Sequence, residues 1–130
     1  MSAHPDRATA VAIARRFLDR MAAMDYDAVT AMLTDDCVVE MPFSPGPQLH
    51  RGPAEFHAAM QFVPDFCSRM SFAIQNDAYD PETGRVTLEY TSDCTRTDGR
   101  PYANRYVGLW DIAGDKVRCW KEFYNPVLLA

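Results

Sequence analysis

The stretch that decides the fold spans residues 102–126 and reads YANRYVGLWDIAGDKVRCWKEFYNP. Two runs rich in β-branched and aromatic residues flank a turn at residues 113–115, which predicts a β-hairpin. Alternate residues of a strand share a face, so the second run should place Trp120, Glu122 and Tyr124 together. One face of the first run carries Asn104, Tyr106, Gly108 and Trp110.

Upstream of this hairpin the sequence predicts helix, helix, strand, helix and then further strands. Apolar residues recur at helical spacing from Ala8 to Met24, and Asp25 is a good N-cap for a shorter helix whose buried stripe ends at Leu33. Pro53 can open a third helix that Pro64 would stop. Short alternating runs predict strands at residues 37–41, 70–74 and 86–91.

Residues 42–53 hold four prolines and two glycines, which predicts a loop without regular structure. This loop is either the rim of a pocket or a plain surface connection. Helices first and an antiparallel meander afterwards make a single α+β domain over residues 1–130. A twisted sheet with helices on one face curls around them, and an incomplete curl leaves a pocket between the two layers.

Composition and short motifs exclude several classes of partner and site. A net charge of −5 argues against nucleic acid and anionic membranes as main partners. The first residues lack the apolar core of a signal peptide and no apolar run could span a bilayer, so a cytoplasmic location is the default expectation. The four cysteines form no Cys-x-x-Cys pair, and the three histidines have no metal-ligand spacing, so neither a disulfide framework nor a metal site is expected. No nucleotide or flavin motif is present, and we expect no cofactor.

Two segments carry a resemblance to a known family. Residues 33–42, LTDDCVVEMP, are similar to the helix-to-strand junction of ketosteroid isomerases, which runs Asp-Asp-Ala-x-x-x-Asp-Pro. Residues 106–126 resemble the last hairpin of SnoaL-like proteins and of phenazine-biosynthesis A/B proteins, which contains Arg-Glu-Phe-x-Asn-Pro. The chain therefore resembles the nuclear transport factor 2-like superfamily over nearly its whole length. The resemblance implies a cone-shaped domain with a curved antiparallel sheet wrapped around N-terminal helices, a fold that hosts many activities.

The departures from this pattern are informative. By the resemblance, the base of ketosteroid isomerases falls at Met41, their tyrosine at Phe17 and their second aspartate at Tyr106. Met and Phe cannot transfer a proton, so steroid-type isomerisation by that machinery is not expected. The resemblance to phenazine-type proteins places their acid–base glutamate at Glu122 and, with a register offset, their pocket histidine at His57.

For each candidate the residues leave two interpretations. Glu122 is either a solvated strand residue, held ionised by Arg118 on its face, or a pocket carboxyl whose pKa burial raises. His57 is either a helix-surface residue or a proton shuttle, and Tyr106 either packs or donates to an oxyanion. Asn104 either fixes a substrate carbonyl or makes a cross-strand bond. The remaining candidates for a flat, apolar ligand are Phe17, Met41, Phe43, Trp110, Trp120 and Tyr124.

The sequence thus favours a cofactor-free acid–base enzyme that isomerises, cyclises, condenses or dehydrates a small cyclic or aromatic ketone-like molecule. Glu122 would relay the proton, assisted by His57 and Tyr106. The alternative is a non-catalytic ligand-binding or accessory protein of a biosynthetic pathway. A homodimer through the outer sheet face is expected in either case. The substrate is not specified by the sequence.

Overall fold

The computed structural model describes residues 4–129 and contains both predicted N-terminal helices, α1 (Arg7–Ala22) and α2 (Tyr26–Thr30). Side chains cap both helices as their sequences indicate. Asp6 accepts a hydrogen bond from the Thr9 amide at 2.8 Å, and Asp25 accepts one from the Ala28 amide at 3.1 Å. The second helix is shorter than predicted, because Leu33, assigned to its buried stripe, already begins the first strand.

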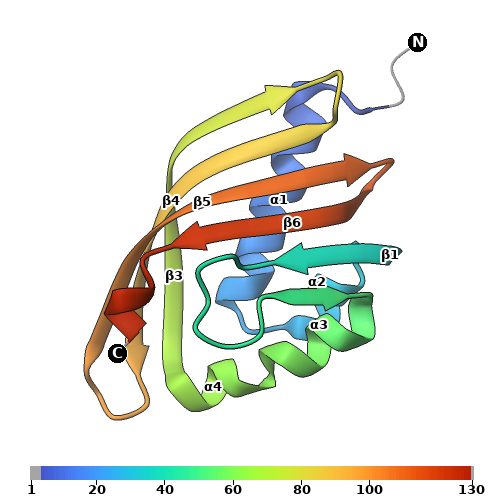
Figure 1. Ribbon diagram of the computed structural model, residues 1–130. Helices are drawn as coiled ribbons and strands as arrows, with labels where there is room; N and C mark the ends of the chain where they lie inside the picture. Colours follow the sequence, from blue (N-terminus) through green and yellow to red (C-terminus); the bar gives the residue numbers. More distant parts are fainter. Residues whose placement is uncertain (1–3, 130) are drawn as a thin grey trace.

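The third helical region is longer than predicted. It consists of α3 (Pro53–Ala59), the 3₁₀ turn η1 (Met60–Phe62) and α4 (Val63–Phe66). Pro64 does not end the helical region, because it lies in the first turn of α4. A backbone N–H at that position would have no partner within the helix, so its absence costs nothing. This succession of short helices carries the chain across one end of the sheet (Figure 1).

The expectation of a loop without regular structure at residues 42–53 is wrong. A short strand, β2 (Leu49–Arg51), forms within it and pairs antiparallel with β1 (Leu33–Glu40). The amide of Met41 donates to the carbonyl of Gln48 at 2.8 Å and closes the loop at the start of this pairing. The prolines lie on either side of the strand, where no ladder N–H is needed.

The four long strands follow as predicted and join the first two in one six-stranded sheet. They are β3 (Cys67–Asp80), β4 (Arg85–Arg96), β5 (Pro101–Ala113) and β6 (Lys116–Tyr124). The strand order is β2-β1-β6-β5-β4-β3, and the chain ends in a 3₁₀ turn, η2 (Pro126–Leu129). The sheet is mixed rather than wholly antiparallel, because β1 runs parallel to β6. The α+β fold class is confirmed.

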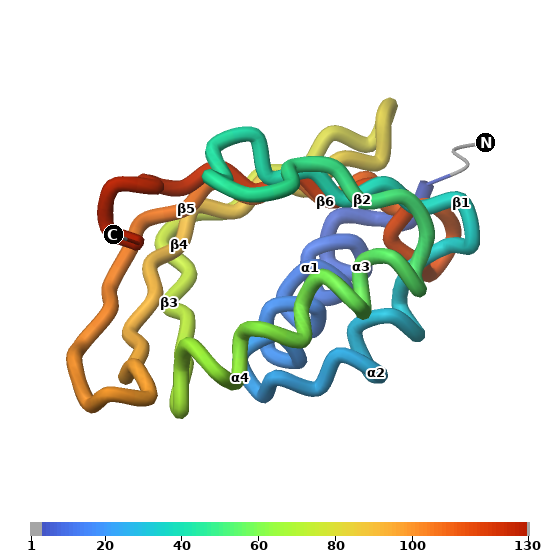
Figure 2. The backbone as a smooth tube through the Cα atoms, turned by 60° about the horizontal axis from the view of Figure 1, so that its bottom comes forward, coloured from blue at the N-terminus to red at the C-terminus, as the bar shows by residue number. Residues whose placement is uncertain are grey.

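All helices lie on one face of the sheet, and the sheet remains open (Figure 2). Helix α1 crosses the sheet and buries its apolar stripe there, with Phe17 packed edge-on against Trp110 and Trp120 at 6.0 and 4.8 Å between ring centroids. These three side chains fill the centre of the core, so the space left between the layers lies beside α1 rather than under it.

Candidate active site

A cavity of about 500 Å³ lies between the sheet and the helices, within the range of about 300–1,000 Å³ usual for small-molecule sites. Its walls come from the strands β2, β3, β5 and β6, the loop after β1, the helices α1 to α4, and the 3₁₀ turns η1 and η2. Most of its surface is apolar. The residues that line it include Met21, Met41, His50, Met60, Met70, Tyr102, Tyr106, Glu122 and Tyr124.

Glu122 is the one acidic residue among the described residues that line this cavity, and only 7% of its surface is exposed. Burial raises the pKa of its carboxyl to about 7, and a hydrogen bond from Tyr90 partly opposes this rise. The Tyr90 hydroxyl donates to Oε2 of Glu122. Both protonation states of Glu122 are therefore populated near neutral pH, as a group that gives and takes protons requires.

A bulge in the hairpin decides which residues share the face of Glu122. Asp111 pairs with Cys119 and Ile112 with Val117, so Arg118 is left without a partner on β5. The alternation shifts at this point, and Arg118 is exposed while Glu122 faces inward. The expectation that Arg118 shares the face of Glu122 is wrong, and no salt bridge joins the two within residues 4–129.

Tyr90 is a residue of this site that the sequence analysis did not identify. It lies fully buried on β4, opposite Tyr106 on β5, and reaches Glu122 on β6 across Gly108. A Cβ atom at Gly108 would stand 2.9 Å from the Tyr90 hydroxyl oxygen and 2.5 Å from Cη2 of Trp110. The glycine therefore provides the space that both rings occupy. The alternation of apolar residues over residues 86–92 could have shown that Tyr90 faces inward. Its contact with Glu122 could not be predicted in this way, because it depends on strand register.

Tyr106 lines the cavity and stacks on Tyr90, with 5.0 Å between ring centroids and 10° between ring planes. Its hydroxyl shares a hydrogen bond of 2.8 Å with Oγ of Ser92. Burial, followed by the nearby charge of Glu122, raises the pKa of the Tyr106 phenol, which keeps it a neutral donor. The structure thus brings Tyr106 and Glu122 into one cavity, and the oxyanion role of Tyr106 stays a prediction.

Asn104 does not have the free amide that contact with a substrate requires. Its Nδ2 donates to the Tyr102 hydroxyl at 2.7 Å and to the Asn125 carbonyl at 2.9 Å. Its Oδ1 accepts from the backbone amides of Arg105 and Asn125, at 2.8 and 3.2 Å. All four hydrogen-bonding positions are used within the protein. Asn104 makes the cross-strand structural bond, and it orients Tyr102, which does line the cavity.

The predicted pocket position of His57 is wrong. Its Nε2 bonds Oδ1 of Asp27 at 2.8 Å at the surface, and His57 is not among the residues that line the cavity. The histidine in the cavity is His50, on β2, which is 8% exposed. Sequence reasoning missed it because the surrounding prolines suggested an irregular loop, whereas His50 is the inward residue of a three-residue strand.

The six residues predicted to contact a flat, apolar ligand divide into three groups. Trp110, Trp120 and Phe17 are core residues that do not line the cavity, which corrects their predicted contact with a ligand. Met41 and Tyr124 do line it.

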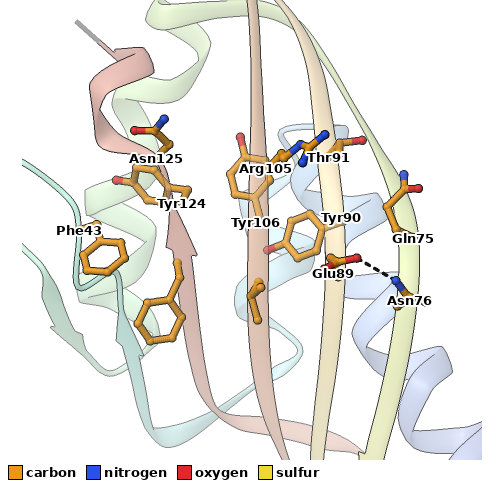
Figure 3. A pocket seen from close by; sticks show the side chains of 12 residues that line it. Phe43, Gln75, Asn76, Glu89, Tyr90, Thr91, Arg105, Tyr106, Tyr124 and Asn125 are labelled. Carbon is orange, nitrogen blue, oxygen red and sulfur yellow. Dashed lines mark hydrogen bonds between the residues drawn. The ribbon is translucent and has the colours of Figure 1, made fainter.

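Phe43 projects on the other side of the sheet. It is 51% exposed and packs on Phe123 at 5.6 Å between ring centroids, beside an outer hollow that Figure 3 shows. Its predicted place in the ligand pocket is therefore wrong.

Within residues 4–129 no group of three or more His, Cys, Asp or Glu side chains is arranged to hold a metal ion. None of the helices in this range has both the length and the apolar character needed to cross a bilayer.

The profile described as a SnoaL-like domain matches residues 14–120, most of the chain. The chain belongs to the SnoaL-like domain family. The matched region ends just before Glu122, and the resemblance of the last residues to phenazine-biosynthesis proteins stays a prediction. No sequence among curated proteins matches this SnoaL-like protein significantly.

Solved structures share its fold at low sequence identity. A proposed isomerase from Bacillus subtilis superposes with a TM-score of 0.85 at 20% identity, covering 93% of this chain and 89% of that one. The BvnE pinacolase from Penicillium brevicompactum gives 0.82 at 19% identity, over 95% and 87% of the two chains. A proposed polyketide cyclase from Xanthomonas campestris pv. campestris gives 0.74 at 19% identity, over 92% of each. Other solved structures that share this fold are named NTF2-like, so the nuclear transport factor 2-like fold is confirmed.

Proposed function

We propose that this SnoaL-like protein is a general acid–base enzyme that isomerises, cyclises or dehydrates a small cyclic or aromatic ketone-like molecule without a cofactor. The observation that carries the proposal is the Glu122 carboxyl, buried at the wall of an apolar cavity with a pKa raised to about 7. A base buried in this way is poorly solvated and therefore reactive toward a weakly acidic C–H bond. Solved structures with this fold include the proposed isomerase, the pinacolase and the proposed cyclase.

Glu122 would act as the proton relay and Tyr90 would orient it. The bond from Tyr90 occupies Oε2, and within residues 4–129 the other carboxyl oxygen has no hydrogen-bond partner. That free oxygen would take a proton from one carbon or oxygen of the substrate and return it to another. Tyr106, a neutral phenol in the same cavity, would donate a hydrogen bond to the oxygen on which negative charge develops.

The base can be tested before the substrate is known. In 5-nitrobenzisoxazole, a flat aromatic molecule, removal of the ring C–H proton by a carboxylate breaks the N–O bond and releases a coloured phenolate. We expect the wild-type protein to accelerate this reaction and Glu122→Gln to lose roughly 100-fold or more of the acceleration, the usual contribution of a general base. The rate should rise with pH through about 7, because only the ionised carboxyl accepts the proton.

The control is Glu89→Gln, the same substitution at an exposed position on the outer face of the sheet. This variant should react like the wild type. If the wild type and Glu122→Gln react at the same rate, Glu122 is not a base that a ligand can reach, and the proposal fails. Binding of 5-nitrobenzisoxazole without acceleration would instead favour the non-catalytic ligand-binding protein.

A further inference from the structure

His50 is a buried polar side chain without a partner. It is 8% exposed and lines the cavity that holds Glu122. Within residues 4–129, no hydrogen bond or ion pair involves its ring, and neither ring nitrogen is sealed off from the cavity. A neutral imidazole carries one N–H donor and one acceptor, so burial without partners is unfavourable. Because both ring nitrogens remain accessible, a ligand in the cavity, or water in its absence, can supply the partner.

We propose that His50 binds an uncharged oxygen, that of a ketone or a phenol, on a cyclic ligand whose carbon framework reaches Glu122. This inference deepens the proposed function and names the class of molecule that the cavity takes. His50 is distinct from the groups that would transfer the proton, because it lies on β2, two strands away from Glu122 in the same sheet.

The sheet register sets the distance between the two groups. His50 pairs with Val39, and Val39 pairs with Trp120, so His50 and Trp120 lie in one row across the sheet. Glu122 lies two residues further along β6. Two strand spacings of about 4.8 Å and two residues of about 3.3 Å put the Cα atoms of His50 and Glu122 about 12 Å apart. Both side chains line the cavity and shorten this span, so one bicyclic molecule can contact both.

The lining of the cavity sets the charge of the ligand. Among the described residues around it, none is a lysine or an arginine, and the one acidic residue is Glu122. A carboxylate or phosphate ligand would therefore enter an apolar cavity without a cationic partner, at a high desolvation cost. The thioether side chains of Met21, Met41, Met60 and Met70 favour a flat apolar framework instead.

The probes that test this inference differ by one group. They are 2-naphthol, naphthalene, which lacks the oxygen, and 2-naphthoate, which carries a carboxylate. Binding is measured by calorimetry to the wild type, to His50→Leu, to His50→Gln and to His57→Leu, the surface histidine that serves as control. We expect the wild type and His57→Leu to bind 2-naphthol about 2- to 12-fold more tightly than naphthalene, the effect of one hydrogen bond. His50→Leu should lose this preference and keep its affinity for naphthalene, and His50→Gln should recover part of it.

Several results would overturn the inference. They are equal affinity of the wild type for 2-naphthol and naphthalene, a preference that survives in His50→Leu, tightest binding of 2-naphthoate, or no binding of any probe. If His50→Leu does not fold, the ¹⁵N signals of the His50 ring in the wild type decide. They should shift with 2-naphthol and not with naphthalene, and an unchanged signal rejects the inference. The oxygen preference is independent of turnover, so a Glu122→Gln variant that still accelerates the benzisoxazole reaction would reject the base and leave His50 untouched.

Discussion

Replacing Glu122 by glutamine should remove a pH dependence of stability that this one carboxyl creates. Its pKa is raised from 4.5 to about 7 in the folded protein, so between these pH values the folded state holds a proton that the unfolded state has released. Stability therefore falls as pH rises through this window, and the loss is complete above about 7. The gap between 4.5 and about 7 corresponds to roughly 3 kcal/mol. Glutamine does not ionise, so the variant should lack this slope.

The assay is urea unfolding of both proteins at a series of pH values from below 4.5 to above 7. The quantity of interest is the difference in unfolding free energy between Glu122→Gln and the wild type, in which the titration of all other groups cancels. If the glutamine amide destabilises the fold by an amount that does not vary with pH, the whole difference is offset, but its dependence on pH is unchanged. We expect the difference to move in favour of the variant by roughly 3 kcal/mol across the window. A flat difference, or one that moves the opposite way, would refute the argument, and Glu89→Gln should give a flat line.

Tyr90→Phe removes the hydrogen bond that lowers the pKa of Glu122, so the midpoint of the benzisoxazole pH–rate profile should move above that of the wild type; an unmoved midpoint contradicts this. Gly108→Ala places a Cβ atom 2.5 Å from Trp110, so unfolding free energy should drop by about 1–3 kcal/mol in urea titrations, whereas Gly114→Ala, with no atom within 4 Å of its Cβ, is the control with conformational strain only. Light scattering should give about twice 14.7 kDa, since we propose a homodimer through the outer sheet face, where Val107 is exposed; a monomer mass rejects it.

The inward position of Glu122 was predictable from local sequence. Strand alternation over residues 120–124 is regular, and the large aromatic residues beside Glu122 indicate a buried face. Arg118 was assigned to the same face because the bulge that separates it from Trp120 leaves no mark in the composition of the strand. The fold class required only the order of helices and strands, which the apolar periodicity carries.

Partners of Glu122 from other strands were not predictable. Tyr90 contacts Glu122 only because Tyr90 pairs with Tyr106 while Gly108 pairs with Glu122, and a shift of one residue would turn Tyr90 to the other face. His50 was missed for a different reason. Its strand is three residues long and owes its existence to pairing with β1, a tertiary contact that overrides the turn propensity of the flanking prolines.

The most direct test of the account is an NMR titration of the Glu122 side-chain carboxyl carbon, assigned by its disappearance in Glu122→Gln. The account predicts a midpoint at about 7, because burial at the cavity wall disfavours the ionised form. A midpoint near 4.5, the ordinary value for a glutamate, would mean that water solvates this carboxyl, and the proposed proton relay would be contradicted.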